Sequence, residues 1–153
     1  MQATMDGARR RTATALTFAG ALPFVLALPA LFFEVPPDDT ARTFLLDAVM
    51  LYGAVIASFV SGLHWGIYLD PARAERAELN LFVSSNICAL AAWSALLLPM
   101  PHAPFLLLAV VFAALLAIDR SLFRKDIIER WFFTLRLRIS AIVVPSCLLL
   151  AFF

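Results

Sequence analysis

The chain has 153 residues, of which 63% are hydrophobic and 15% charged, and its formal net charge is +1. Soluble domains are about half apolar and about a quarter charged, so this composition excludes an ordinary water-soluble domain. It favours an all-α helical bundle in a bilayer, where the backbone must satisfy its own hydrogen bonds. The small net charge gives no reason to expect a nucleic-acid partner. We therefore expect one membrane domain over residues 1–153.

Five apolar segments approach the roughly 20 helical residues that a bilayer core about 30 Å thick requires. They cover residues 16–33, 44–69, 79–98 and 104–118, and a last segment that ends at 153 and begins between 131 and 139. Pro23 and Pro29 should kink or tilt the first segment, because each removes a helical hydrogen bond. A cleaved signal peptide is the alternative there, but the segment is long and lacks a clear small-x-small site, which favours a retained anchor. Residues 1–14 are expected to form a flexible basic N-terminus.

The basic residues alternate between the ends of these segments. Arginines precede the first segment, follow the second and cluster after the fourth, and of the 12 basic residues only Arg42 falls on the other side. Cytoplasmic loops carry the excess of Lys and Arg. The pattern predicts five transmembrane helices with the N-terminus inside and the C-terminus outside.

A separate amphipathic element is predicted just before the fifth span. Phe123, Ile127, Trp131 and Leu135 recur every four residues within the stretch 120–135. Such a helix suits the inner membrane interface, with Trp131 at headgroup depth. The alternative is a cytoplasmic loop that packs on the bundle.

Small residues form a stripe on the second segment, at Ala54, Ser58, Gly62 and Gly66. A stripe at this spacing lets a second helix approach closely, and its last two members form a GxxxG motif. We expect helix packing here against another helix of the same chain. The alternative is a second copy of the chain, which makes a homo-oligomer.

His64 lies on the same segment, within the predicted membrane core. An ionisable residue at that depth indicates a functional site by default. We expect an inner-leaflet pocket that binds a ligand through His64, Trp65, Tyr68 and Asn86. Two other roles stay open for His64: a neutral side chain that hydrogen-bonds two helices, and a group that handles protons.

A buried Asp119 would need a cation, and three arginines are predicted at its level: Arg120, Arg136 and Arg138. They predict an ion pair, either buried or at the interface. Cys88 and Cys147 lie in apolar runs, which predicts small buried side chains rather than a disulfide or a metal site. The sequence shows no catalytic motif, so we expect no catalytic residue and no enzyme chemistry.

The run from Tyr52 to Gly66, with the pattern Y-G-A-x-I-x-S-F-x-x-G-x-H-W-G, resembles a family of bacterial multi-pass membrane proteins filed as a domain of unknown function. Its vertebrate mitochondrial member is called transmembrane protein 69. Pro23, Asp119-Arg120, Trp131 and Leu135-Arg136 are also similar to that family. The resemblance implies a multi-pass protein of an inner membrane and carries no established activity.

These observations favour a small accessory, assembly or scaffold protein of a membrane complex in the bacterial inner membrane. The alternative is a binding protein for a membrane-soluble ligand, such as a quinone or another isoprenoid, at the pocket around His64. A transporter is less well supported, because the chain shows no internal repeat. The partners expected are the lipid bilayer and another membrane protein.

Overall fold

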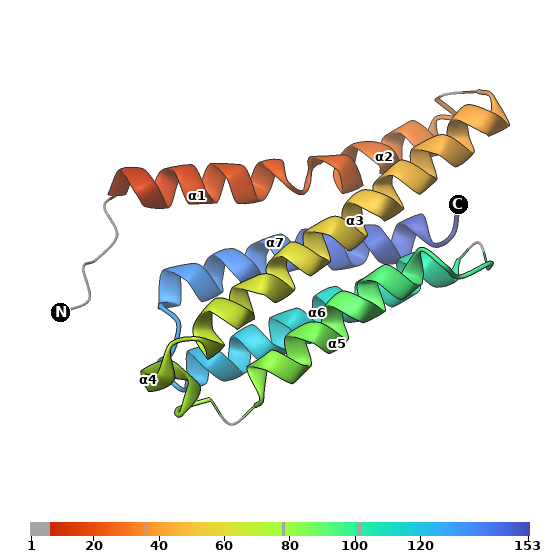
Figure 1. Cartoon of the computed structure of the whole chain (residues 1–153). Helices are drawn as coiled ribbons and strands as arrows, with labels where there is room; N and C mark the ends of the chain where they lie inside the picture. Colours follow the sequence, from red (N-terminus) through yellow and green to blue (C-terminus); the bar gives the residue numbers. More distant parts are fainter. Residues whose placement is uncertain (1–6, 36, 78, 101) are drawn as a thin grey trace.

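The computed structural model describes residues 7–35, 37–77, 79–100 and 102–153, and this part of the chain is helical and contains no strand. The helices are α1 (Gly7–Ala19), α2 (Leu22–Phe32), α3 (Asp39–Tyr68), α4 (Pro71–Ala74), α5 (Leu81–Ala95), α6 (Ala103–Arg124) and α7 (Arg130–Leu150). In Figure 1, α3, α5, α6 and α7 lie side by side, while α1 and α2 run along the outside as one bent rod. The predicted all-α class is confirmed.

The bend between α1 and α2 lies just before Pro23. A proline within a helix removes one hydrogen bond, and its ring clashes with the carbonyl four residues earlier, here that of Ala19. The chain therefore ends α1 at Ala19 and restarts at Leu22, with Pro23 in the first turn of α2. Residues 7–14, which we expected to be flexible, are helical, whereas residues 1–6 lie outside the described part of the chain.

α3 is the longest helix, with 30 residues, and a side chain caps its start. The carboxylate of Asp38 accepts a hydrogen bond from the amide of Ala41 at 3.0 Å, which satisfies one of the free N–H groups of the first turn. α3 packs on α5, and α6 packs on α7, so that these four helices enclose a common apolar core. The close packing of these helices brings side chains from α3, α6 and α7 into contact with one another.

The prediction of a separate interfacial helix over residues 120–135 is wrong. α6 continues to Arg124, and Asp126 then adopts a left-handed backbone with φ of 52°. The amide of Ile127 bonds to the carbonyl of Leu122, and the amide of Asp126 bonds to that of Phe123, which forms a Schellman cap. The buried side chains of Ile127 and Leu122 accompany it. The four-residue periodicity therefore belongs to the end of α6, a tight turn and the start of α7.

Among the described residues, four helical stretches are long and apolar enough to cross a membrane: Gly7–Phe32, Asp39–Tyr68, Ala103–Arg124 and Arg130–Leu150. The 15-residue α5 is apolar but shorter. Large apolar side chains, such as those of Phe44, Phe59 and Val110, are exposed on the outside of the bundle. A surface of this kind is costly in water and stable in lipid. The chain is a multi-pass membrane protein.

Candidate functional site

A buried carboxylate joins three helices inside the bundle, near the C-terminal ends of α3 and α6. Asp119 on α6 contacts His64 on α3, with 3.0 Å between Oδ1 and Nε2. It also accepts a hydrogen bond from Nε of Arg136 on α7, at 2.7 Å to Oδ2. The three side chains are buried, with exposed fractions of 1% for His64, 2% for Asp119 and 7% for Arg136. We call these three residues the buried triad.

Each helix turns its triad residue inward because the neighbouring positions on the same face are apolar or small. On α3, His64 continues a buried face that includes Ala57, Val60 and Ser61. The hydroxyl of Ser61 donates a hydrogen bond to the carbonyl of Ala57 at 2.8 Å, within its own helix. Ser61 therefore does not compete with Asp119 for the side chain of His64. On α7, Arg136 lies one turn before Ser140, which is also buried.

The ion pair with Arg136 sets the roles of the atoms in the triad. A carboxylate offers only acceptors, so Nε2 of His64 carries the hydrogen and donates it to Asp119. Nδ1 of His64 then lacks a partner, and so does Nη2 of Arg136; both atoms are buried and make no hydrogen bond to any described residue. Buried polar atoms in native proteins nearly always have a partner. The triad therefore has hydrogen-bonding capacity left for another molecule.

Two cavities border the triad. A polar cavity of about 500 Å³ is lined by His64 and Asp119, together with Arg73, Glu129 and Trp131 and apolar side chains from α3 and the α6–α7 turn. An apolar cavity of about 320 Å³ lies between α1, α3 and α7 and includes Arg136 in its wall.

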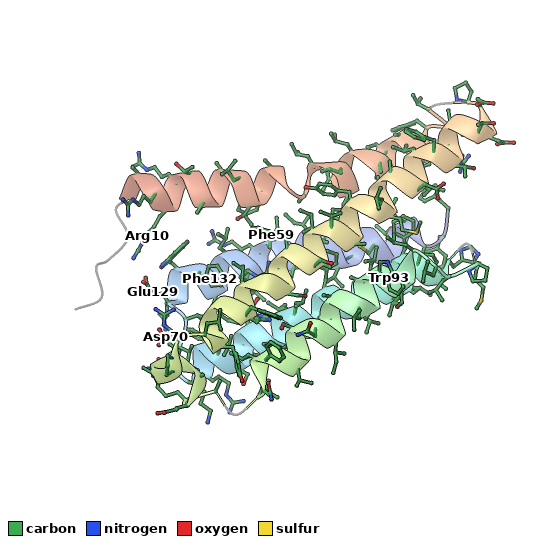
Figure 2. The ribbon with its side chains drawn as sticks, viewed as in Figure 1. Arg10, Phe59, Asp70, Trp93, Glu129 and Phe132 are labelled. Carbon is green, nitrogen blue, oxygen red and sulfur yellow. The ribbon has the colours of Figure 1, made fainter. Side chains whose placement is uncertain are left out.

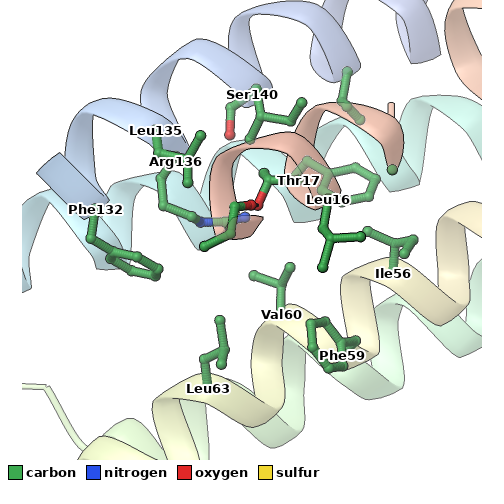
Figure 3. Close-up of a pocket in the computed structure, with 15 residues that line it drawn as sticks. Leu16, Thr17, Ile56, Phe59, Val60, Leu63, Phe132, Leu135, Arg136 and Ser140 are labelled. Atoms are coloured by element: carbon green, nitrogen blue, oxygen red, sulfur yellow. The ribbon is translucent and has the colours of Figure 1, made fainter. Parts of the chain in front are cut away.

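Leu63 and Phe132 line both cavities, so the two spaces adjoin. Figure 3 shows Phe132 and Arg136 extending from α7 toward the side of α3 that carries Val60 and Leu63. The triad thus lies beside a polar space that continues into an apolar one.

The structure does not bring together the ligand-binding residues that we expected around His64. Trp65 and Tyr68 are partly exposed and contact Phe82 on α5, with ring centroids 4.7 and 5.4 Å apart. Asn86 donates to the carbonyl of Phe82 at 2.7 Å, within its own helix. Of the predicted set, only His64 lines the polar cavity.

The predicted ion pair forms with one of the three candidate arginines. Arg136 reaches Asp119, and the pair is buried rather than interfacial. Arg120 and Arg138 are exposed and line other surface hollows. Adjacent residues, or residues two apart, point to different sides of a helix, so Arg120 cannot share the inward direction of Asp119, nor Arg138 that of Arg136.

The small-residue stripe does not pack within the chain as we expected. Ala54 is buried, but Ser58, Gly62 and Gly66 are exposed. A Cβ atom added at Gly62 or Gly66 would meet no described atom within 4 Å. The close approach occurs at Gly53, where a Cβ atom would lie 3.0 Å from Leu108 and 3.3 Å from Phe24. The position next to the stripe, and not the GxxxG motif, is the one that needs a glycine.

Two functional features were missed from the sequence. The first is the contact between His64 and Asp119, because only arginines were expected as partners of Asp119. The signal in the sequence that could have revealed this contact is that His64 and Asp119 were both predicted at a similar depth in the membrane. The second is the contribution of the α6–α7 turn and the start of α7 to the polar cavity. In the described part of the chain, no three His, Cys, Asp or Glu side chains gather to hold a metal ion.

The fold and the triad define a class: polytopic helical membrane proteins with a cluster of ionisable side chains buried between their helices. Within that class the chain belongs to the family described as "Protein of unknown function (DUF3429)", whose sequence profile matches residues 9–152. No curated protein and no solved structure matches the chain.

Proposed function

We propose that this protein binds a membrane-soluble molecule with a small polar head, such as a quinone, its quinol or another isoprenoid, beside the buried triad. The observation that carries the proposal is the buried, unpartnered Nδ1 of His64, a residue that lines a polar cavity of about 500 Å³. Charged groups inside a membrane bundle are costly to bury and typically mark functional sites.

The two adjoining cavities suit the two parts of such a ligand. With Nε2 donating to Asp119, a neutral His64 offers Nδ1 as an acceptor for a hydroxyl, and a protonated His64 offers it as a donor for a carbonyl. The indole nitrogen of Trp131, also unpartnered among the described residues, adds a donor. The apolar cavity would receive the hydrocarbon part of the ligand.

The orientation of the bundle is part of the same proposal. We infer five crossings, with α5 as the third, because α5 packs along α3 and α6 and turns at Leu97 and Leu98 extend it. The N-terminal arginines, α4 and the α6–α7 turn gather at one end of the bundle, where Arg76 donates to the carbonyl of Asp126 at 2.9 Å. This basic end would face the cytoplasm in the bacterial inner membrane.

Copurification and thermal unfolding test whether the protein binds such a ligand beside His64. The protein purified in mild detergent should carry a quinone or isoprenoid detectable in its lipid extract, and His64→Ala should lose it. The other histidine gives the matched control: His102 contacts the carbonyl of Ala151 away from the triad, so His102→Ala should keep the ligand.

An added quinone at about 100 times its dissociation constant should raise the free energy of unfolding of the wild type by about 2.7 kcal/mol. It should not stabilise His64→Ala. If the wild type carries no such molecule and shows no stabilisation by added quinone, the proposal is wrong and the triad serves only to join helices.

A second candidate function is an accessory or assembly role in a membrane complex. The specific observation is the exposed stripe of Ser58, Gly62 and Gly66, which leaves room for a transmembrane helix of another protein. This candidate predicts that Gly62→Leu abolishes copurification of that protein and leaves the ligand at His64 in place. A transporter role stays a weaker proposal and would require substrate uptake that depends on His64 or Asp119.

We also propose that proteins similar to transmembrane protein 69 share this site. The residues on which that resemblance rests include His64, Asp119 and Arg136, which are the three members of the buried triad.

A further inference from the structure

A third cavity, of about 680 Å³, lies at the basic end of the bundle between α1 and α7. Arg10 and Phe18 line it from α1, and Arg130, Trp131 and Arg138 line it from α7, together with Glu129 at the N-cap of that helix. It uses a different face of α1 from the apolar cavity, whose lining residues on that helix are Ala13, Leu16 and Thr17. We call it the basic cavity.

The charges of the basic cavity do not cancel. Arg10 pairs with Glu129 at 3.1 Å and lies 5.3 Å from the ring centre of Trp131. Figure 2 shows Arg10 and Glu129 approaching one another at the end of the bundle. Arg130 and Arg138 form no ion pair with any described residue. Two positive charges are therefore left in the wall of the cavity.

The start of α7 adds donors to these charges. Arg130, Thr134 and Arg138 are spaced four residues apart and share one face of α7. No side chain caps the N-terminus of α7, so its first amides and the positive end of the helix dipole stay available to an anion. Nε of Arg10 is buried without a partner among the described residues.

We propose that the basic cavity binds the phosphate headgroup of an anionic glycerophospholipid. Arg130, Arg138 and the uncapped helix terminus match the charge of a phosphodiester, and Trp131 belongs at headgroup depth. The acyl chains would extend along the lipid-facing side of α1 and α7, past Phe18. Glu129 and Trp131 line both this cavity and the polar cavity, whereas Arg130 and Arg138 line the basic cavity and not the polar one. Variants of these two arginines therefore test this proposal separately from the ligand at His64.

Native mass spectrometry of the delipidated full-length protein tests the site, with phosphatidylglycerol and phosphatidylcholine as the added lipids. The wild type should retain phosphatidylglycerol in preference to phosphatidylcholine. The double variant Arg130→Gln/Arg138→Gln should weaken phosphatidylglycerol binding roughly 25-fold, since each basic residue near an anionic surface contributes about a fivefold effect.

The matched control is Arg9→Gln/Arg11→Gln. It removes the same charge from the same end of the protein, at exposed positions outside the cavity, and should bind like the wild type. Should the first double variant fail to fold, Arg138→Gln alone should show a smaller loss in the same direction.

Three results would overturn the proposal. Unchanged lipid binding in the folded cavity variants would exclude the site. An equal loss in the control would mean that only the overall charge of this end attracts anionic lipid. Displacement of the lipid by millimolar inorganic phosphate would mean that the cavity takes a free anion instead of a headgroup.

Discussion

At the scale of single residues, the cost of burying Asp119 decides much of the chemistry. A carboxylate removed from water loses several kcal/mol of solvation, which the contacts with Arg136 and His64 must offset. These two contacts occupy both carboxylate oxygens. The remaining unpartnered atoms belong to the two cationic or ionisable partners, so the capacity to bind another molecule lies with His64 and Arg136.

Asp119→Asn should lower the free energy of unfolding by about 3–5 kcal/mol, because it leaves the charge of Arg136 buried without a counter-charge. Thermal unfolding in mild detergent would show this as a large drop in the midpoint. Arg120→Gln, at the exposed neighbouring position, should unfold like the wild type. The double variant Asp119→Asn/Arg136→Met should recover part of the loss, since it removes both charges. An Asp119→Asn protein as stable as the wild type would contradict the role given to the ion pair.

At the scale of helices and turns, two acidic residues occupy the left-handed position just after a helix, where glycine is the most common residue. Glu34 and Asp126 have φ values of 54° and 52°, and each is the left-handed residue of a Schellman cap, after α2 and after α6. Because these signals do not use glycine, the sequence pattern did not reveal them. The cap at Asp126 explains why α7 begins at Arg130, one residue before the predicted range, and why no separate interfacial helix forms.

The glycines of α3 give a comparison at the same scale. Gly53→Ala should lower the free energy of unfolding by about 1–3 kcal/mol, because its methyl group would press on the fully buried Leu108 and Phe24. Gly62→Ala and Gly66→Ala meet open space and should be neutral or gain up to about 1 kcal/mol from helix propensity. Thermal unfolding of the three variants checks the order. A loss at Gly62 or Gly66 larger than that at Gly53 would indicate a partner helix on the stripe.

At the scale of the whole molecule, the two ends of the bundle differ in charge, and both proposed binding sites lie at the basic end. The basic end holds the triad's polar cavity, through Arg73 and Glu129, and the basic cavity. The other end contains the turn at Glu34 and the contact between His102 and Ala151. Both proposed binding sites therefore lie toward the side that we assign to the cytoplasm.

Single cysteines and a membrane-impermeant thiol reagent test this topology in intact cells. Thr40→Cys and Met100→Cys, at exposed positions, should react from outside, whereas Glu75→Cys should react only after permeabilisation. The native Cys88 and Cys147 are buried and should give little background. Met100→Cys decides the role of α5: protection of this residue in intact cells would mean that α5 does not cross the membrane.

The sequence by itself determined the helical membrane class, the concentration of basic residues at one end and the individual interest of His64, Asp119 and Arg136. These are properties of position along the chain, such as the length of an apolar run and the place of a charge relative to its ends. They do not depend on how the helices meet.

Only the tertiary structure decided that His64 meets Asp119, that Arg136 and not Arg138 completes the pair, and that Trp65 turns toward Phe82. Each of these contacts depends on the rotation of a helix about its axis, which advances by about 100° per residue. An error of one or two residues in a predicted helix therefore moves a side chain from the core to the lipid. The packing of neighbouring helices sets that rotation, and no single segment of the sequence specifies it.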